Sequence, residues 1–122
     1  MEICVNDYIR TKDGFIRKVG EIDRCQECNE KIYISVDIID GLHFERSWHL
    51  KEIVSHSKNI IDLIEVGDYV NGKKVLRIND YEDFKRADFN LDYDDGDAVY
   101  NEDIKTILTK EQYEQNSYKI GE

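Results

Sequence analysis

The chain contains no proline, one tryptophan and three cysteines among its 122 residues. Because proline is absent, every residue has the backbone N–H that strand pairing uses. For the same reason, no proline-rich linker marks a domain boundary. An odd number of cysteines does not make a disulfide framework, which is typical of a reducing compartment. No apolar run approaches the roughly 20 residues that span a bilayer. We therefore expect no membrane association.

Signals for export and for catalysis are also missing. The stretch 1–7 has neither the basic region nor the apolar region of a secretory signal, which predicts a cytoplasmic protein. The sequence contains no glycine-rich phosphate loop, no nucleophile elbow and no His-Glu-x-x-His pattern. Its three histidines lie in one short window around Trp48. We expect a protein without enzymatic activity.

Acidic residues outnumber basic ones by 27 to 17, which gives a formal net charge of -10. Such a charge repels phosphate backbones and anionic lipid, so the sequence predicts no direct contact with nucleic acid. The same charge favours association with a protein that has a basic surface, because the summed field steers the encounter.

Two pairs of matching segments recur in the same order along the chain. Val5–Ile9 matches Val66–Val70, and Leu50–Ser55 matches Ile104–Thr109. Self-similarity of this kind is the signature of a duplicated structural unit. We predict two tandem modules, residues 1–64 and 65–122.

Short alternating segments and turn residues predict strands in both modules. Asp13-Gly14 and Asn71-Gly72 each favour a tight hairpin. Thr109, with Gln112 three residues later, predicts the start of a short helix. The fold class is all-β, mainly β with one-turn helices, as two tandem small five-stranded barrels of the Src-homology-3 type. The other expected strands are 32–38, 48–54, 60–64, 103–108 and 118–120.

The runs 56–72 (HSKNIIDLIEVGDYVNG) and 104–113 (IKTILTKEQY) resemble a group of short uncharacterised phage and prophage proteins of low-GC Gram-positive bacteria. The similarity covers most of the chain. It implies a phage accessory protein acting in the cytoplasm of the host cell, and it brings no functional residues with it. The sequence departs from the group at Cys25–Cys28 and in the stretch 79–103.

Cys25-Gln26-Glu27-Cys28 has the spacing of one half of a zinc knuckle. Zinc needs further ligands, and the remaining side chains of suitable chemistry are Cys4, His43, His49 and His56. The alternative is a pair of free thiols at a hairpin turn. Apart from this structural zinc, we expect no cofactor.

The stretch Asn79–Asp103 contains ten acidic residues and only two basic ones, and it reads as an acidic insertion in the second module. Part of it is similar to a calcium loop, but its glycine and acidic positions do not fit that register. Aromatic rings among acidic side chains are typical of a protein interface, although a solvated loop is the simpler reading. The predicted partner-binding residues are Tyr81, Phe84, Phe89, Asp92, Tyr93, Asp94, Asp95, Asp97 and Tyr100.

Two function hypotheses remain. The first is an inhibitor that binds a host protein with a basic surface, plausibly a defence protein, in the manner of an anti-CRISPR that mimics nucleic acid. The second is a small-ligand binder, such as a sponge for a cyclic-nucleotide immune signal, with its site between the modules or across a homodimer. The second hypothesis needs cations, for which the sequence offers Arg10, Arg17, Arg24, Arg46 and Lys58.

Overall fold

The computed structural model describes residues 2–91 and 97–116, and this part of the chain is mostly β. The chain divides into two compact units, Met1–Asn59 and Ile60–Glu122. Within the described ranges, no helix has the length and the hydrophobicity that crossing a bilayer requires.

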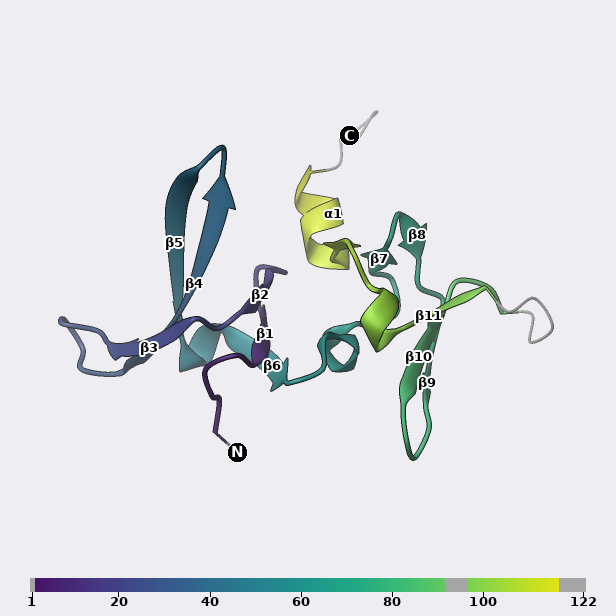
Figure 1. Ribbon diagram of the computed structural model, residues 1–122, viewed down its shortest axis with the longest axis horizontal. Helices are drawn as coiled ribbons and strands as arrows, with labels where there is room; N and C mark the ends of the chain where they lie inside the picture. The colour runs from purple at the N-terminus through teal and green to yellow at the C-terminus, as the bar shows by residue number, and fades with distance from the viewer. Residues whose placement is uncertain (1, 92–96, 117–122) are drawn as a thin grey trace. The chain divides into compact units, whose positions relative to one another are not determined.

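The first unit consists of two three-stranded antiparallel sheets with strand orders β2-β1-β6 and β3-β4-β5 (Figure 1). The chain passes from β2 to β3 through Val19 and Gly20. The Val19 N–H donates to the carbonyl of Asp7, beside β1, and the Gly20 N–H donates to the carbonyl of Ile34, on β4, both at 2.8 Å. The elements are β1 (Tyr8–Thr11), β2 (Ile16–Lys18), β3 (Glu21–Arg24), β4 (Lys31–Ile39), β5 (Leu42–His49), the 3-10 helix η1 (Leu50–Glu52) and β6 (Ile53–Ser57).

The core of the first unit is a cluster of apolar side chains from both sheets. Tyr33 and Trp48 lie directly opposite each other on β4 and β5, and both are buried. Large aromatic rings supply much of the buried area of a small core. The cluster comprises Ile3, Ile9, Val19, Tyr33 and Trp48, with Phe15, Ile22 and Ile53 packed against it.

The second unit contains the sheets β8-β7-β12 and β9-β10-β11. Its first hairpin turns at Asn71 and Gly72, which both have positive φ, as the Asn-Gly dipeptide predicts. The elements are the 3-10 helix η2 (Ile60–Leu63), β7 (Tyr69–Val70), β8 (Lys73–Lys74), β9 (Arg77–Asp80), β10 (Lys85–Asp88), β11 (Ala98–Tyr100), the 3-10 helix η3 (Asn101–Asp103), β12 (Ile107–Leu108) and α1 (Lys110–Asn116).

The Asp-Tyr strand opens on the same hydrogen-bonded turn in both units. The Asp7 carboxylate accepts the Cys4 N–H at 3.0 Å, and the Asp68 carboxylate accepts the Glu65 N–H at 2.8 Å. Tyr8 then pairs with Lys18, and Tyr69 pairs with Lys74. The repeated Asp therefore has the same local role twice, which is to hold the turn that precedes the first strand.

The remaining strands also correspond in register. Arg24 pairs with Lys31 across β3 and β4, and Asp80 pairs with Lys85 across β9 and β10. Counted from these pairs, Tyr33 and Trp48 correspond to Ala87 and Val99, and His49 corresponds to Tyr100. The described part of the segment 79–103 therefore contains β10, β11 and the second half of β9, which form the sheet that corresponds to β3-β4-β5.

Several sequence-based predictions need correction. In the predicted strand 60–64, residues Ile60–Leu63 form the 3-10 helix η2 instead. Ile61, Leu63 and Ile64 are all buried, and a strand with alternating faces does not bury the neighbours 63 and 64 on one side. The predicted strand 48–54 is interrupted by η1. The match of Ile53 to Ile107 is shifted, since His56 and Ile107 are the residues that pair with Ile9 and Val70.

The predicted β-rich fold is confirmed, but its arrangement as two small barrels is not. No closed barrel is found in the described residues, which form separate three-stranded sheets. The predicted strand 118–120 lies outside the residues that the structure describes.

Candidate metal centre and contact surfaces

Cys25 and Cys28 lie in the turn that joins β3 to β4. The turn is closed by the Cys25 N–H, which donates to the Glu30 carbonyl at 2.8 Å, and by the Asn29 N–H, which donates to the Cys25 carbonyl at 2.8 Å. Asn29 has a φ of 60°, a conformation that Asn tolerates better than most residues. A short turn thus brings the two thiols together.

His49 is the last residue of β5 and lies opposite Ile32, the second residue of β4. This register brings its ring to the Cys turn, with Nε2 only 3.4 Å from the Cys28 Sγ. The ligand atoms of Cys25, Cys28 and His49 all lie within 4.8 Å of one another. The structure therefore selects one of the four additional ligands that the sequence offered.

The other three proposed ligands are placed elsewhere. Cys4 is exposed and contacts the Glu2 carbonyl through its Sγ at 3.8 Å. The Nδ1 of His56 lies 3.6 Å from the Asp7 carboxylate. His43 pairs with Ile38 near the far end of the β4–β5 hairpin. Within the described chain, the group of side chains that could hold a metal ion contains none of these three residues.

The surroundings of the thiols favour a negative charge on Cys25. The backbone N–H of Cys28, the His49 side chain and the backbone N–H of Glu27 lower the pKa of the Cys25 thiol to about 7. The backbone N–H of Glu30 favours the Cys28 thiolate, but Cys25 and desolvation outweigh it and raise the pKa of Cys28. Contact with Cys25 raises the pKa of His49. Thiolates are the forms that bind metal ions.

Glu52 lies on the other side of the His49 ring. Its Oε2 accepts the His49 backbone N–H at 2.7 Å and lies 3.7 Å from the ring Nδ1. The His49 ring therefore has a carboxylate near one nitrogen and a thiol near the other. Such an arrangement fixes the orientation of an imidazole that ligates a metal.

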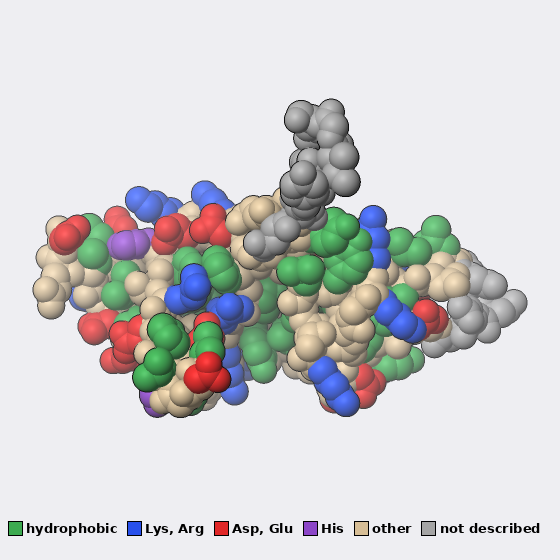
Figure 2. Space-filling view, turned by 90° about the horizontal axis from the view of Figure 1, so that it is seen from above, with side chains coloured by type: hydrophobic (Ala, Val, Ile, Leu, Met, Phe, Trp, Pro, Cys, Tyr) green, Lys and Arg blue, Asp and Glu red, His purple; other side chains and the backbone are tan. Residues whose placement is uncertain are grey.

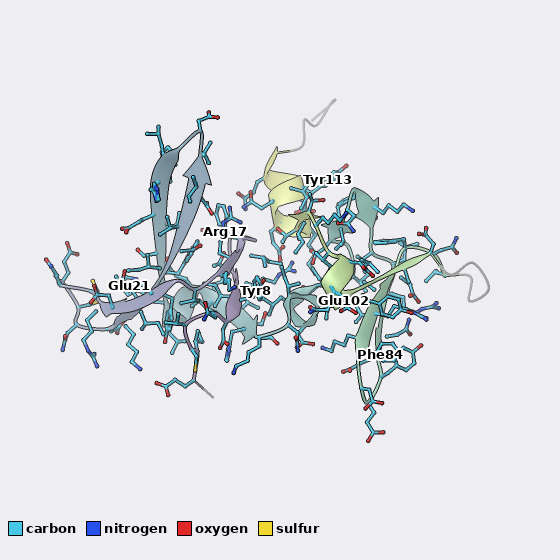
Figure 3. All side chains as sticks on the ribbon, viewed as in Figure 1. Tyr8, Arg17, Glu21, Phe84, Glu102 and Tyr113 are labelled. Atoms are coloured by element: carbon cyan, nitrogen blue, oxygen red, sulfur yellow. The ribbon has the colours of Figure 1, made fainter. Side chains whose placement is uncertain are left out.

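Three of the predicted partner-binding residues meet on the surface of the second unit. We call Tyr81, Phe84 and Tyr100 the ring cluster. The Tyr81 and Phe84 centroids are 4.7 Å apart, and those of Phe84 and Tyr100 are 5.8 Å apart. The three residues are 40 to 48% exposed. In Figure 3, Phe84 lies at the hairpin formed by β9 and β10. The Arg86 guanidinium lies 5.7 Å from the Tyr81 centroid.

The other predicted partner-binding residues do not join this cluster. Phe89 is half-buried, with the Lys73 ammonium 5.7 Å from its ring centroid, and the same ammonium pairs with Asp97 at 3.0 Å. The four residues Asp92, Tyr93, Asp94 and Asp95 lie outside the described residues.

Sequence reasoning missed an exposed apolar surface on the first unit. Beyond residue 34, β4 no longer pairs with β3, so 35–39 and 42–46 continue as a two-stranded ribbon, visible as the long hairpin in Figure 1. Figure 2 shows hydrophobic side chains among the charged ones at the surface. We give the name apolar ribbon to five large apolar side chains of this hairpin that are 46 to 66% exposed: Val36, Ile38, Ile39, Leu42 and Phe44.

The basic side chains proposed to bind a small ligand have different surroundings. Arg10 is fully buried, and Arg17 pairs with Asp37 at 3.4 Å. The guanidinium of Arg46 lies 4.7 Å from the Phe15 centroid. Arg24 lines an open cavity of about 590 Å³, whose lining comprises Arg24, Asn29, Glu30, Lys31, Tyr33, Leu50 and Lys51.

Comparisons with known proteins do not add a function. No protein-family model matches the chain, and neither the curated proteins nor the solved structures contain a significant match. Inference about function therefore starts from the side chains and their geometry.

Proposed function

We propose that this protein is a non-catalytic binding protein that contacts another protein through the apolar ribbon. The observation that carries the proposal is the exposure of five large apolar side chains on a two-stranded hairpin. In the strand register, Val36 and Ile38 lie on one face of the hairpin, and Ile39, Leu42 and Phe44 lie on the other. Both faces therefore carry exposed apolar side chains, which are typical of interaction sites in soluble proteins. An isolated two-stranded ribbon is marginally stable in water, so a partner that covers it also stabilises it.

Charge supports a basic partner. Residues 60–122 contain sixteen acidic and eight basic side chains, whereas residues 1–59 contain eleven and nine. Acidic side chains also flank the apolar ribbon, at Asp37, Asp40 and Glu45. The resemblance to phage proteins makes a host protein the expected target and inhibition of a host defence the expected result.

We also propose the Src-homology-3 plan for each unit. Three observations support it. Each unit has the same strand order in its two sheets. A continuous segment leads from the first sheet to the second at Val19–Gly20 and at Val75–Leu76. The N–H groups of Val19 and Val75 donate to the carbonyls of Asp7 and Asp68, and those of Gly20 and Leu76 donate to the carbonyls of Ile34 and Asp88. A 3-10 turn precedes the last strand in both. Small barrels of this type expose loops and strand edges for binding.

Cross-linking in host lysate tests the partner proposal. The double variant Ile38→Ser/Leu42→Ser removes apolar contact area, and Val54→Ser is the matched control, since Val54 is exposed to a similar degree on β6. We expect a specific cross-linked protein with wild type and with the control, and at least a tenfold loss with the double variant.

Two outcomes contradict the proposal. Equal cross-linking by the double variant would show that the apolar ribbon is not the contact. A wild-type dimer in size-exclusion chromatography that the double variant converts to a monomer would identify the partner as a second copy of this chain instead. Because the replaced side chains are exposed already, stability should change by less than about 0.5 kcal/mol.

The cavity beside β4 favours the small-ligand hypothesis as a second candidate. Its lining includes the cations Arg24, Lys31 and Lys51, which suit an anionic ligand such as a cyclic nucleotide. Thermal-shift measurements with cyclic dinucleotides test this candidate. A ligand-dependent rise in melting temperature that Lys51→Ala removes would support it, and the absence of any rise would exclude it for the ligands used.

A further inference from the structure

We infer that the first unit binds one zinc ion through the Sγ atoms of Cys25 and Cys28 and the Nε2 of His49, with Glu52 as a positioning residue and the fourth coordination position open to water or to an outside ligand. This inference is independent of the proposed contact with a partner protein.

The distances between the ligand atoms fit one tetrahedral ion. Zn–S bonds of about 2.3 Å and Zn–N bonds of about 2.0 Å place a sulfur and a nitrogen about 3.5 Å apart, and two sulfurs about 3.8 Å apart. The Cys28 Sγ and His49 Nε2 are 3.4 Å apart, and no pair of the three ligand atoms exceeds 4.8 Å. Small rotations of the side chains bring all three atoms to bonding distance.

The turn itself keeps the two cysteines close together. The Cys25 N–H donates to the Glu30 carbonyl and the Asn29 N–H donates to the Cys25 carbonyl, both at 2.8 Å. The left-handed conformation of Asn29, directly after the second cysteine, reverses the chain between the two strands.

Glu52 completes the arrangement from the far side of the ring. A metal-bound imidazole ordinarily donates its other N–H to a carboxylate, which fixes the tautomer and strengthens the metal bond. With Nε2 facing Cys28 and Nδ1 facing Glu52, the His49 ring is oriented for this role. Two thiolates and an imidazole select a borderline-soft ion such as Zn²⁺ over Mg²⁺ or Ca²⁺, which prefer oxygen ligands.

The second unit provides an independent reason to expect a stabilising link between the β3–β4 turn and the end of β5. His49 corresponds to Tyr100 in strand register, and the β3–β4 turn corresponds to the β9–β10 turn that contains Tyr81 and Phe84. In the second unit, contacts between tilted aromatic rings link the turn to the end of the last strand of the sheet. We infer that the ion does the same in the first unit, where no such rings are present.

Metal loading of the reduced protein tests the inference. Chelator-treated protein is incubated with Zn²⁺ or Co²⁺, the unbound metal is removed, and the metal content is measured. We expect one Zn²⁺ per chain, and with Co²⁺ the visible absorption and the thiolate-to-metal charge transfer of a tetrahedral site. Cys25→Ser, Cys28→Ser and His49→Ala should retain less than a tenth of the metal, whereas the control variants Cys4→Ser and His43→Asn should retain all of it.

Glu52→Gln tests the positioning role, since the amide oxygen can still accept the His49 backbone N–H. We expect one Zn²⁺ per chain with an affinity 10- to 100-fold weaker in competition with a chelator. Unchanged affinity would overturn the role of Glu52. Wild-type protein that binds less than a tenth of an equivalent and leaves three reactive thiols would overturn the site, as would equal loss of metal in Cys4→Ser. The fluorescence of Trp48 shows whether each variant is folded.

Discussion

Asp88, on β10, receives hydrogen bonds from three side chains of the second unit. Arg77 donates from Nη2 at 2.7 Å and from Nε at 2.9 Å, Arg86 donates from Nε at 2.8 Å, and Asn79 donates from Nδ2 at 2.6 Å. The Asp88 side chain is only 4% exposed. Replacing Asp88 by alanine removes the acceptor that all three donors share and leaves two guanidinium charges without it.

The expected loss of stability follows from the burial of these groups. Removing one partner of a buried ion pair costs about 3 to 5 kcal/mol, because the remaining charge stays in the protein unpaired. The Arg77 and Arg86 side chains are 20% and 25% exposed, so water recovers part of their hydration. We therefore expect Asp88→Ala to lower the free energy of unfolding of the second unit by about 3 kcal/mol.

Urea unfolding, followed by NMR signals of Ala87 and Val99, measures this change within the second unit. The control is Asp80→Ala on the neighbouring strand, where the carboxylate is 70% exposed and lies 4.0 Å from the Lys85 ammonium. An exposed pair of this kind contributes at most about 1 kcal/mol. A loss below 1 kcal/mol for Asp88→Ala, or equal losses for the two variants, would refute the reasoning.

The same network predicts a dependence on pH. Burial raises the pKa of Asp88, but the hydrogen bonds from Arg77, Arg86 and Asn79 outweigh it and leave the pKa below its ordinary value. A lowered folded-state pKa gives stability that is fully present above the unfolded pKa of about 3.9 and is lost as the pH falls through the folded pKa. The difference in stability between wild type and Asp88→Ala should therefore narrow below about pH 4.

Two further predictions concern the backbone and the turn before each first strand. Gly72→Ala and Gly41→Ala should each destabilise the protein by about 1 kcal/mol in urea unfolding, because φ is +81° and +78° and no atom crowds either position; a loss at only one of them would contradict a purely conformational cost. Asp68→Ala should cost about 3 kcal/mol, since the Glu65 and Lys110 N–H groups lose their acceptor, and more than Asp7→Ala, where one carboxylate oxygen has no hydrogen-bond partner. Equal losses would show that the second hydrogen bond contributes little.

Local turn chemistry was the part of the fold that sequence predicted well. The Asn71-Gly72 hairpin is confirmed, and so is the Thr109 cap, whose Oγ1 accepts the Gln112 N–H at 3.3 Å. Both features depend on residues within four positions of one another. The segment 60–64 was predicted wrongly because a short apolar run fits a strand and a helical turn equally, and tertiary packing decides between them.

The candidate sites show the same division between local and long-range information. Spacing identified Cys25 and Cys28, but choosing His49 required the strand register that brings it across 21 residues. The apolar ribbon escaped notice because Ile38, Ile39 and Leu42 have the composition of a core strand. They have no partner on the β3 side because β3 begins only at Glu21, which lies opposite Ile34.

Corresponding positions in the two units show how one backbone plan is stabilised by different chemistry. The first unit has Tyr33 opposite Trp48, where the second has Ala87 opposite Val99. The second unit therefore has a smaller apolar core at this layer, and the position of Ile34 in the first unit is occupied by Asp88 with its ion network. Lost burial of two large rings weakens the hydrophobic contribution, so polar contacts have to hold β9, β10 and β11 together. We therefore expect the second unit to be especially sensitive to the loss of the Asp88 carboxylate, whereas the first unit depends on the packing of Tyr33 and Trp48.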